Sequence, residues 1–201
     1  MIDFLVIGGG IAGTSAAARL SALGGVTLLE GEDALAYHAS GRSAALFEEQ
    51  YGQPSTVALN EASRAYHFAA DVLSPRGLLL VGTATDADAF ADDQAHMQLD
   101  DLTVAEAKAL IPIIDTQKID RVAFDADAWD IDTDSLVQGF ARTARQNGAT
   151  IHAKSLVTEI TRTKAGWAVQ TKAETFEART LVNAAGAWVD QIATMAGITP
   201  L

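Results

Sequence analysis

Apolar runs and glycine-rich turns alternate at the start of the chain. Residues 4–7 form an apolar run that predicts a buried strand, and the alanine-rich residues 14–23 predict a helix. A second apolar run, residues 26–29, predicts another strand that ends on Glu30. The order strand, helix, strand is typical of an α/β fold with a parallel sheet.

The next part of the chain changes to a helical pattern. Apolar residues recur at helical spacing over residues 54–73, and Pro54 fits the first turn of such a helix. Residues 74–77 contain a proline and a glycine, which end the helix. The apolar run at residues 78–82 then predicts a buried strand.

Helix and strand patterns continue in a second lobe. Residues 84–100 are acidic and helical in character, and Thr103 with Glu106 forms a capping box that opens a short helix. Residues 121–124 predict another strand. We therefore expect residues 76–130 to form a lobe inserted into the first domain.

Five aspartates between residues 125 and 134 suggest two interpretations. A calcium loop of the EF-hand type needs glycine at its sixth position and glutamate at its twelfth, where this register has Asp130 and Leu136. The acids at residues 132–134 fit better as the start of an amphipathic helix that ends at Asn147 and Gly148.

The last part of the chain is rich in short strands. Apolar and polar residues alternate in four short segments, which predicts a meander of hairpins. The segments are residues 150–153, 156–161, 167–171 and 175–178. Residues 180–188 repeat the opening theme, because an apolar strand again leads into small residues and a helix. The domain of residues 1–75 is thus expected to resume at residues 131–201.

Composition narrows the class of protein. The 201 residues are 49% hydrophobic, which is enough for one large domain and part of a second. Acidic residues outnumber basic ones by 26 to 14, which argues against nucleic acid and against an anionic membrane as partners. Cysteine is absent, and no apolar run approaches the ~20 residues of a membrane helix, so we expect a soluble cytoplasmic protein.

The glycine turn carries the most specific chemistry. Gly8 permits a tight turn, Gly10 lets a pyrophosphate approach the backbone, and Gly13 lets the helix pack closely on the sheet. The N–H groups at the helix start then face the phosphates. Glu30 can accept hydrogen bonds from a ribose diol and would repel a 2′-phosphate, which favours FAD or NAD over NADP. The alternative is a strand–helix turn that binds no ligand.

A second candidate segment follows the acid. Residues 37–45 are small and polar, and Ser40, Arg42 and Ser43 are hydrogen-bond donors for phosphate or for a polar ring edge. We interpret this loop as a second wall of the dinucleotide site. The alternative is a flexible surface loop.

Together these segments resemble a known family. Five segments are similar, in the same order, to the N-terminal half of bacterial FAD-dependent D-amino-acid dehydrogenases: residues 6–13, 37–45 with 51–52, 74–76, 130–134 with 138–139, and 181–188. The likeness is greatest to D-arginine dehydrogenases, within the group that includes glycine oxidase and sarcosine oxidase. It implies an α/β fold with a Rossmann-like FAD-binding domain of the GR2 type, a β-meander and part of an inserted α+β substrate domain. It also implies hydride transfer from an amino acid to flavin N5, which gives an imino acid and then a 2-oxo acid and ammonia.

The resemblance also assigns residues. It places Ile11 and Ala12 at the pyrophosphate turn, Glu30 and Gly31 at the adenosine ribose, and the backbone of Val157 at the adenine. Tyr51 would line the substrate pocket. The cofactor residues are then Gly8, Gly10, Ile11, Ala12, Gly13, Glu30, Gly31, Ala39, Ser40, Gly41, Arg42, Ser43, Ala44, Ala45, Leu46, Val157, Ala184, Gly186 and Trp188.

Departures from the family bear on the substrate. Arginine-specific members have a histidine where this chain has Leu46, and a glutamate where it has Leu78. Without that carboxylate a buried cation would be costly, so we expect a neutral or apolar D-amino acid. Family members are nearly twice as long, and their second half would carry the arginine that binds the substrate carboxylate. We therefore expect this chain to be a fragment, or one half of a split enzyme.

Other functions stay open at this point. An NAD-dependent dehydrogenase would share the glycine turn, and a non-catalytic FAD-binding subunit could lend its domain to a partner chain or to another copy. A hydrolase lacks support because the chain has no Gly-x-Ser-x-Gly elbow, and its histidines have no metal-ligand spacing. No catalytic acid or base can be chosen, although His38 is a conceivable neighbour of the flavin. The electron acceptor is not indicated.

Overall fold

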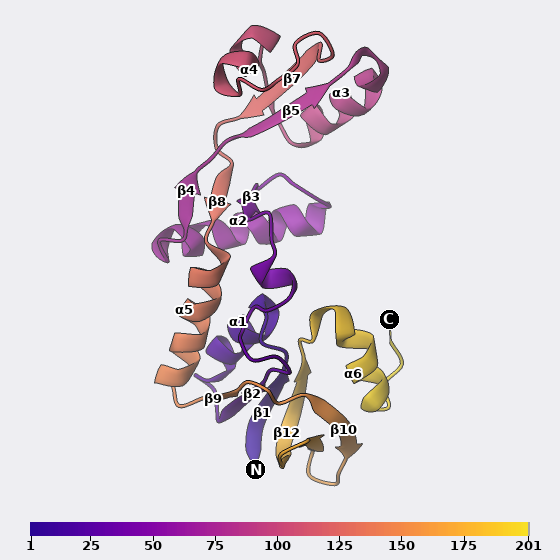
Figure 1. Ribbon diagram of the computed structural model, residues 1–201. Coiled ribbons are helices and arrows are strands. Elements are labelled where there is room, and N and C mark those ends of the chain that lie inside the picture. The colour runs from indigo at the N-terminus through magenta and orange to yellow at the C-terminus, as the bar shows by residue number, and fades with distance from the viewer. Residues whose placement is uncertain (201) are drawn as a thin grey trace. The chain divides into compact units, whose positions relative to one another are not determined.

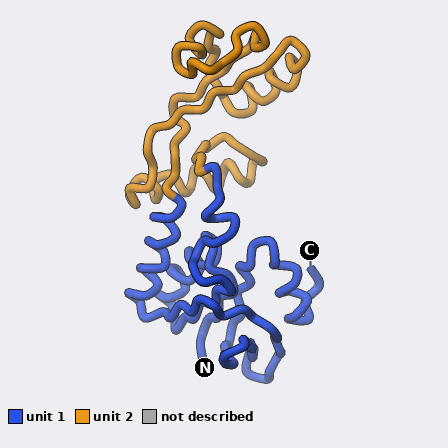
Figure 2. The backbone as a smooth tube through the Cα atoms, in the orientation of Figure 1, with its two compact units in different colours: residues 1–44, 133–201 blue, residues 45–132 orange. Residues whose placement is uncertain are grey.

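The computed structural model describes residues 1–200 and divides the chain into two compact units. Met1–Ala44 and Thr133–Leu201 make up the first unit, and Ala45–Asp132 the second (Figure 2). The sequence placed the first boundary at residue 75, whereas the first unit breaks off at residue 44. Residues 45–75 belong to the second unit because their strands pair with a strand near residue 130.

A six-stranded sheet organises the first unit (Figure 1). Its strand order is β10-β11-β12-β1-β2-β9, and β12, β1, β2 and β9 run parallel to one another. The antiparallel strands β10 and β11 complete a meander that leads into β12. The bounds are β1 Ile2–Ile7, β2 Val26–Leu29, β9 Thr150–His152, β10 Val157–Arg162, β11 Trp167–Thr171 and β12 Thr175–Asn183.

Both faces of this sheet are buried. Leu5, Ile7 and Leu29 pack with residues of the meander and of α6 (Val189–Met195). Val6 and Leu28, which point the other way, pack with α1 (Ile11–Leu20) and α5 (Thr133–Gln146). A strand is expected to be apolar throughout when both faces of its sheet are covered. This explains why apolar and polar residues do not alternate in β1 and β2. Each fully buried leucine contributes about 1.5–3 kcal/mol relative to exposure.

Strand β9 differs from the prediction. We expected residues 150–153 in the meander, but β9 pairs in parallel with β2, where Thr27 faces Thr150. The two threonine hydroxyls form a hydrogen bond of 2.9 Å. A strand of three residues is too short for its alternation to distinguish a hairpin from a parallel partner.

Strand β12 also differs from the prediction, because two predicted strands are one. Its first residues pair antiparallel with β11, and its last residues pair in parallel with β1. Arg179 lies within the strand and donates to the Asp3 carboxylate at 2.7 Å. The long strand therefore joins the meander directly to the parallel sheet.

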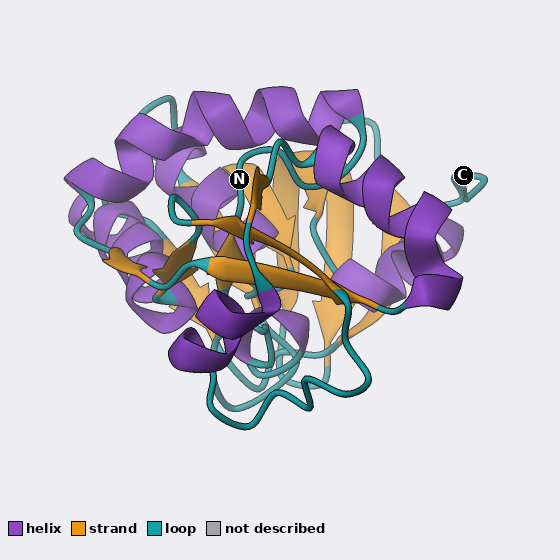
Figure 3. Cartoon of the chain, turned by 90° about the horizontal axis from the view of Figure 1, so that it is seen from above, coloured by secondary structure: helices purple, strands orange, loops and turns teal. Residues whose placement is uncertain are grey.

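The second unit contains two small sheets of three strands each. In one sheet, Leu78 and Leu80 pack with Phe90 of α3, while Leu79 packs on the other face with Ala107 of α4. In the other sheet, Trp129 stacks edge-on against Phe68 of α2 with ring centroids 4.8 Å apart. The elements are β3 Leu46–Phe47, α2 Pro54–Ala69, β4 Leu73–Pro75, β5 Leu78–Gly82, α3 Ala87–His96, β6 Asp100–Asp101, α4 Val104–Leu110, β7 Arg121–Asp125 and β8 Trp129–Ile131 (Figures 1 and 3).

Several predicted elements of this unit are confirmed. Helix α2 starts at Pro54, strand β5 has the predicted bounds, and α4 opens with the capping box. In that box the Thr103 hydroxyl accepts from the Glu106 N–H, and the Glu106 carboxylate accepts from the Thr103 N–H at 2.9 Å. Strands β3, β4 and β8 were not predicted. No helix among residues 1–200 is both long and apolar enough to cross a lipid bilayer.

A buried carboxyl makes the stability of the protein depend on pH. Glu48 is 5% exposed, and its Oε2 atom has no hydrogen-bond partner. Burial, reinforced by the nearby Asp125, raises the pKa of Glu48 to about 7 from an ordinary 4.5. The folded state therefore holds this proton more tightly than the unfolded state. Stability from this group is present below about pH 4.5 and is lost as the pH rises to about 7.

Removal of this charge should stabilise the protein at alkaline pH. We expect Glu48→Gln to raise the free energy of unfolding by about 1–3 kcal/mol at about pH 8, with little change near pH 5. Urea unfolding across this pH range measures the effect. Glu61→Gln, at an exposed glutamate on α2, is the matched control. It should leave the free energy of unfolding unchanged both at about pH 8 and at about pH 5. Equal pH profiles for Glu48→Gln and the natural protein would contradict the account.

Candidate functional site

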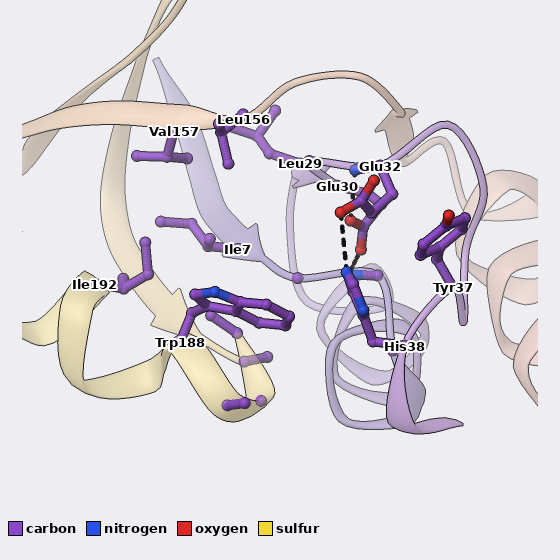
Figure 4. A pocket seen from close by; sticks show the side chains of 18 of the residues that line it. Ile7, Leu29, Glu30, Glu32, Tyr37, His38, Leu156, Val157, Trp188 and Ile192 are labelled. Carbon is purple, nitrogen blue, oxygen red and sulfur yellow. Dashed lines mark hydrogen bonds and ion pairs between the residues drawn. The ribbon is translucent and has the colours of Figure 1, made fainter. Parts of the chain in front are cut away.

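A pocket lies at the carboxyl ends of β12, β1 and β2 in the first unit (Figure 4). Its volume is about 360 Å³, within the range of about 300–1,000 Å³ typical of ligand pockets. Open parallel sheets bind their ligands at this edge. The lining residues are Ile7, Gly8, Gly9, Gly10, Leu29, Glu30, Gly31, Glu32, Ala36, Tyr37, His38, Ala39, Ser40, Ser155, Leu156, Val157, Ala184, Ala185, Gly186, Ala187, Trp188 and Ile192.

The glycine turn forms the floor of the pocket. Gly8 has a φ of +111°, and a Cβ atom there would lie 2.3 Å from the Ala184 carbonyl oxygen. A Cβ on Gly13 would lie 1.8 Å from the Gly8 carbonyl oxygen, so α1 contacts the turn backbone directly. A Cβ on Gly10 would meet only the Ser40 hydroxyl, at 3.0 Å. Gly8 and Gly13 therefore allow the fold, and Gly10 keeps the turn open to the pocket.

The start of α1 offers backbone donors. Gly10 occupies the N-cap position and supplies no side-chain cap. The Ile11 N–H donates to the Ser40 Oγ at 2.9 Å, which fixes the candidate loop against the helix start. The hydroxyl accepts this bond, so its own O–H is still a donor. Backbone N–H groups and the helix dipole favour an anion here.

Glu30 occupies the tip of β2, where its carboxylate is held by two backbone groups. Its Oε2 accepts from the Gly9 N–H at 2.6 Å, and its Oε1 accepts from the Glu32 N–H at 2.8 Å. A carboxylate has about four acceptor positions, so capacity is left for the hydroxyls of a ribose. A Cβ on Gly9 would lie 2.7 Å from Oε2. A side chain at Gly9 would therefore displace the Glu30 carboxylate, a consequence that the sequence motif did not indicate.

Apolar side chains form the other walls. Ile7 and Leu29 come from the sheet, Leu156 and Val157 from the start of β10, and Ile192 from α6 (Figure 4). Trp188 ends the short helix Gly186–Trp188 and is 42% exposed. Such walls suit the faces of an adenine or another flat ring.

The structure places part of the predicted cofactor set in this pocket. The predicted residues that line it are Gly8, Gly10, Glu30, Gly31, Ala39, Ser40, Val157, Ala184, Gly186 and Trp188. Other predicted residues belong to the same unit but do not line the pocket, namely Ile11, Ala12, Gly13, Gly41, Arg42, Ser43 and Ala44. Ala45, Leu46, Tyr51 and Leu78 belong to the second unit.

The predicted residues of the second unit have different surroundings. Leu46 pairs with Asp130 between β3 and β8. Tyr51 is 64% exposed. Leu78 opens β5 and packs against the cluster of Phe90, Leu99 and Ala123. Within this unit, Leu78 therefore contributes to packing.

The candidate loop is tightly folded around Ala36 and Gly41. Ala36 has a φ of 57°, and its N–H donates to the Gly9 carbonyl at 3.0 Å. A Cβ on Gly41 would lie 2.1 Å from the Ala36 carbonyl oxygen. The guanidinium of Arg42 lies 5.9 Å from the centre of the Tyr37 ring. The start of this loop lines the pocket, and these backbone contacts hold it against the glycine turn.

Several lining side chains were not assigned to the cofactor from the sequence, and three of them make contacts within the pocket or beside it. They are Glu32, Tyr37 and His38, although His38 had been considered as a flavin neighbour. The His38 Nε2 lies 2.9 Å from the Glu32 Oε1, and the His38 ring packs against Trp188. Nothing in the spacing of these residues signals that they meet, because the contact depends on the folding of the whole loop.

The fold and this pocket define a Rossmann-like nucleotide-binding domain. The open glycine turn, the helix start and the Glu30 carboxylate occur together, and the donor and acceptor set fits an adenine dinucleotide. The FAD dependent oxidoreductase (DAO) family matches residues 3–201. The chain belongs to this family, and the cofactor of the family is FAD. The predicted fold class and cofactor are thereby confirmed.

Solved structures support the fold. L-proline dehydrogenase from P. horikoshii has a TM-score of 0.83 at 21% identity, and the match covers 100% of this chain and 57% of that one. Glycine oxidase from Geobacillus kaustophilus has a TM-score of 0.85 at 22% identity, with 97% and 58% covered. L-alpha-glycerophosphate oxidase from Mycoplasma pneumoniae, solved with FAD bound, has a TM-score of 0.83 at 22% identity, with 97% and 56% covered. The chain thus spans less than two thirds of the length of these proteins.

Proposed function

We propose that this chain is the FAD-binding part of an oxidoreductase that oxidises the Cα–N bond of an amino acid. The observation that carries the proposal is the pocket of the first unit, in a chain that belongs to an FAD-dependent family. The printed names of two structural neighbours, a proline dehydrogenase and a glycine oxidase, add support for an amino acid as the substrate. Both neighbours are longer than this chain, so the complete activity needs further polypeptide.

Each part of the pocket has a proposed role in cofactor binding. The turn from Gly8 to Gly13 and the start of α1 hold the pyrophosphate through backbone N–H groups. Glu30 accepts hydrogen bonds from the adenosine ribose, and Leu29 and Val157 contact the adenine. Residues 39–46 follow the pyrophosphate towards the flavin, with Ser40, Arg42 and Ser43 as donors.

The chemistry follows from the cofactor and the substrate class. When bound, FAD accepts the hydride of the substrate α-carbon, and the imino acid that remains is hydrolysed by water to a 2-oxo acid and ammonia. The part of the chain described here contributes binding and orientation. Its apolar walls also exclude water from the cofactor. No residue of this chain is proposed as the acid or base.

The proposed substrate is a neutral D-amino acid. The D configuration rests on the likeness to D-amino-acid dehydrogenases, among which the arginine-specific members were most similar. Leu78 stands where those members have a glutamate, and a cationic side chain would then lack its partner. A neutral side chain has no such requirement.

A second function is favoured by one observation. The first unit holds the glycine turn and Glu30 in one pocket, and no described residue is proposed as the acid or base. A subunit that binds FAD without catalysing the reaction would have these properties. Such a subunit would bind FAD and would leave it oxidised with every amino acid.

Anaerobic bleaching of bound FAD tests both functions. The chain is co-expressed with a candidate complementary C-terminal half, loaded with FAD and mixed with D-alanine, D-methionine, D-arginine or the corresponding L-amino acids, and flavin absorbance is followed. We expect the neutral D-amino acids to bleach the flavin fastest. Faster bleaching by D-arginine or by the L-amino acids would contradict the proposed substrate. Bound FAD that no amino acid bleaches would favour the non-catalytic subunit.

A further inference from the structure

Three side chains from two separate segments meet in this pocket. The Glu32 Oε1 lies 2.9 Å from the His38 Nε2. The His38 ring in turn packs on Trp188, with centroids 4.6 Å apart and an angle of 53° between the planes. Figure 4 shows His38 between the Glu32 carboxylate and the Trp188 indole. The three side chains therefore form a continuous row, which we call the clasp.

The sheet topology places this row over the glycine turn. Glu32 follows β2, and Trp188 follows β12. In the sheet, β1 lies between these two strands, and its carboxyl end leads into the turn at Gly8. Contact between a segment after β2 and a segment after β12 must therefore cross the end of β1. All three side chains and the turn line the same pocket.

The backbone on both sides of the clasp is anchored. The Glu32 N–H donates to the Glu30 carboxylate, and its carbonyl accepts from the Lys154 N–H at 2.7 Å. The His38 carbonyl accepts from the Gly41 N–H at 3.1 Å, and the Trp188 N–H donates to the Ala185 carbonyl at 3.0 Å. The two ends of the clasp are thus fixed points, and the contacts between them are made by side chains alone.

The side chains themselves are only half-buried. Those of His38 and Glu32 are 45% and 43% exposed. They line the pocket, and their hydrogen bond and ring contact can break without unfolding any strand or helix. A contact of this kind is weak enough to open and re-form.

We infer that Glu32, His38 and Trp188 retain the cofactor by closing across the pocket over the glycine turn. The inference rests on the proposed binding of FAD in this pocket. His38 and Trp188 close on the nucleotide, and Glu32 acts through His38 as a positioning residue. Because the clasp must open for entry as well as for release, it slows both steps.

The rates of FAD binding and release test this inference. Association of FAD and its release into excess competitor are followed by flavin fluorescence for the natural protein, Glu32→Gln, His38→Ala and the double variant. We expect each single variant to release FAD about 3- to 10-fold faster, the size expected for one ring contact or surface pair. Association should also become faster, so that Kd changes less than the release rate. The double variant should be no faster than His38→Ala, because both changes break one row.

Matched variants separate the clasp from a general structural role. Trp188→Phe keeps an aromatic partner for His38 and should keep slow release, whereas Trp188→Ala should behave like His38→Ala. Glu159→Gln changes an exposed glutamate on β10 and should release FAD at the natural rate.

Three outcomes would overturn the inference. Release rates within about twofold of the natural protein would exclude the clasp, and so would effects of the two single variants that multiply in the double variant. Slower association with an unchanged release rate would point to a distorted pocket instead. Failure of the natural protein to bind either FAD or ADP would refute the proposed function of the pocket, and the clasp with it.

Discussion

The Gly13→Ala variant is expected to lose FAD binding and to unfold more easily than the natural protein, by about 3 kcal/mol or more. The added Cβ would lie 1.8 Å from the Gly8 carbonyl oxygen. No side chain can move away to relieve this overlap, because the obstacle is the backbone of the turn. Helix α1 would have to shift away from the end of β1, and the pocket floor would shift with it. Thermal unfolding and FAD stoichiometry after reconstitution measure the two effects.

A second helical glycine provides the matched control for Gly13→Ala. A Cβ on Gly139 of α5 would have no atom within 4 Å. Gly139→Ala is therefore expected to stabilise the protein by about 0.5–1 kcal/mol through helix propensity, with normal FAD binding. If Gly13→Ala also bound FAD normally, α1 would not need its close approach to the turn, and the geometry of the pocket floor would be wrong.

The Glu30→Ala variant is expected to have the second largest effect, a loss in FAD affinity of about 10- to 100-fold. The carboxylate accepts the N–H groups of Gly9 and Glu32, so its removal leaves two backbone donors of the pocket without their acceptor. It also removes the proposed partner of the ribose hydroxyls. Equilibrium titration with FAD, followed by quenching of flavin fluorescence, measures the change.

The conservative variant separates the two contributions. Glu30→Gln keeps the shape of the side chain and one oxygen acceptor, so we expect it to lose less affinity than Glu30→Ala. The free energy of unfolding of both variants, measured without FAD, shows how much of the lost affinity comes from a less stable fold. Unchanged FAD affinity in Glu30→Ala would mean that the ribose does not bind at the tip of β2.

Sequence patterns predicted the elements that are fixed by local rules. The apolar runs of β1 and β2, separated by glycines, have few alternative structures, and the capping box at Thr103 marks its helix start by itself. The glycine turn and Glu30 favoured FAD or NAD, the family resemblance implied FAD, and the family match confirms FAD. The family match covers FAD-dependent oxidoreductases in general and does not single out D-arginine dehydrogenases. The D configuration of the substrate therefore stays a prediction.

Elements that depend on distant partners were missed or misplaced. Strands β3, β4 and β8 have two or three residues each, too few for any periodicity, and they exist because they pair with one another. Strand β9 was placed in the wrong part of the sheet for the same reason. In the pocket, Gly9 is tied to the Glu30 carboxylate by its N–H, and His38 is placed by contacts with Glu32 and Trp188. Such contacts arise only in the folded chain.

The central claim is that the first unit binds FAD, and the visible absorption spectrum of the purified chain tests it most directly. After incubation with FAD and removal of the free cofactor, the account predicts two flavin bands in the protein fraction and release of FAD on treatment with acid. Gly13→Ala, treated in parallel, should be colourless. A natural chain that stays colourless under the same conditions, while folded by thermal unfolding, would contradict the claim that this pocket holds FAD.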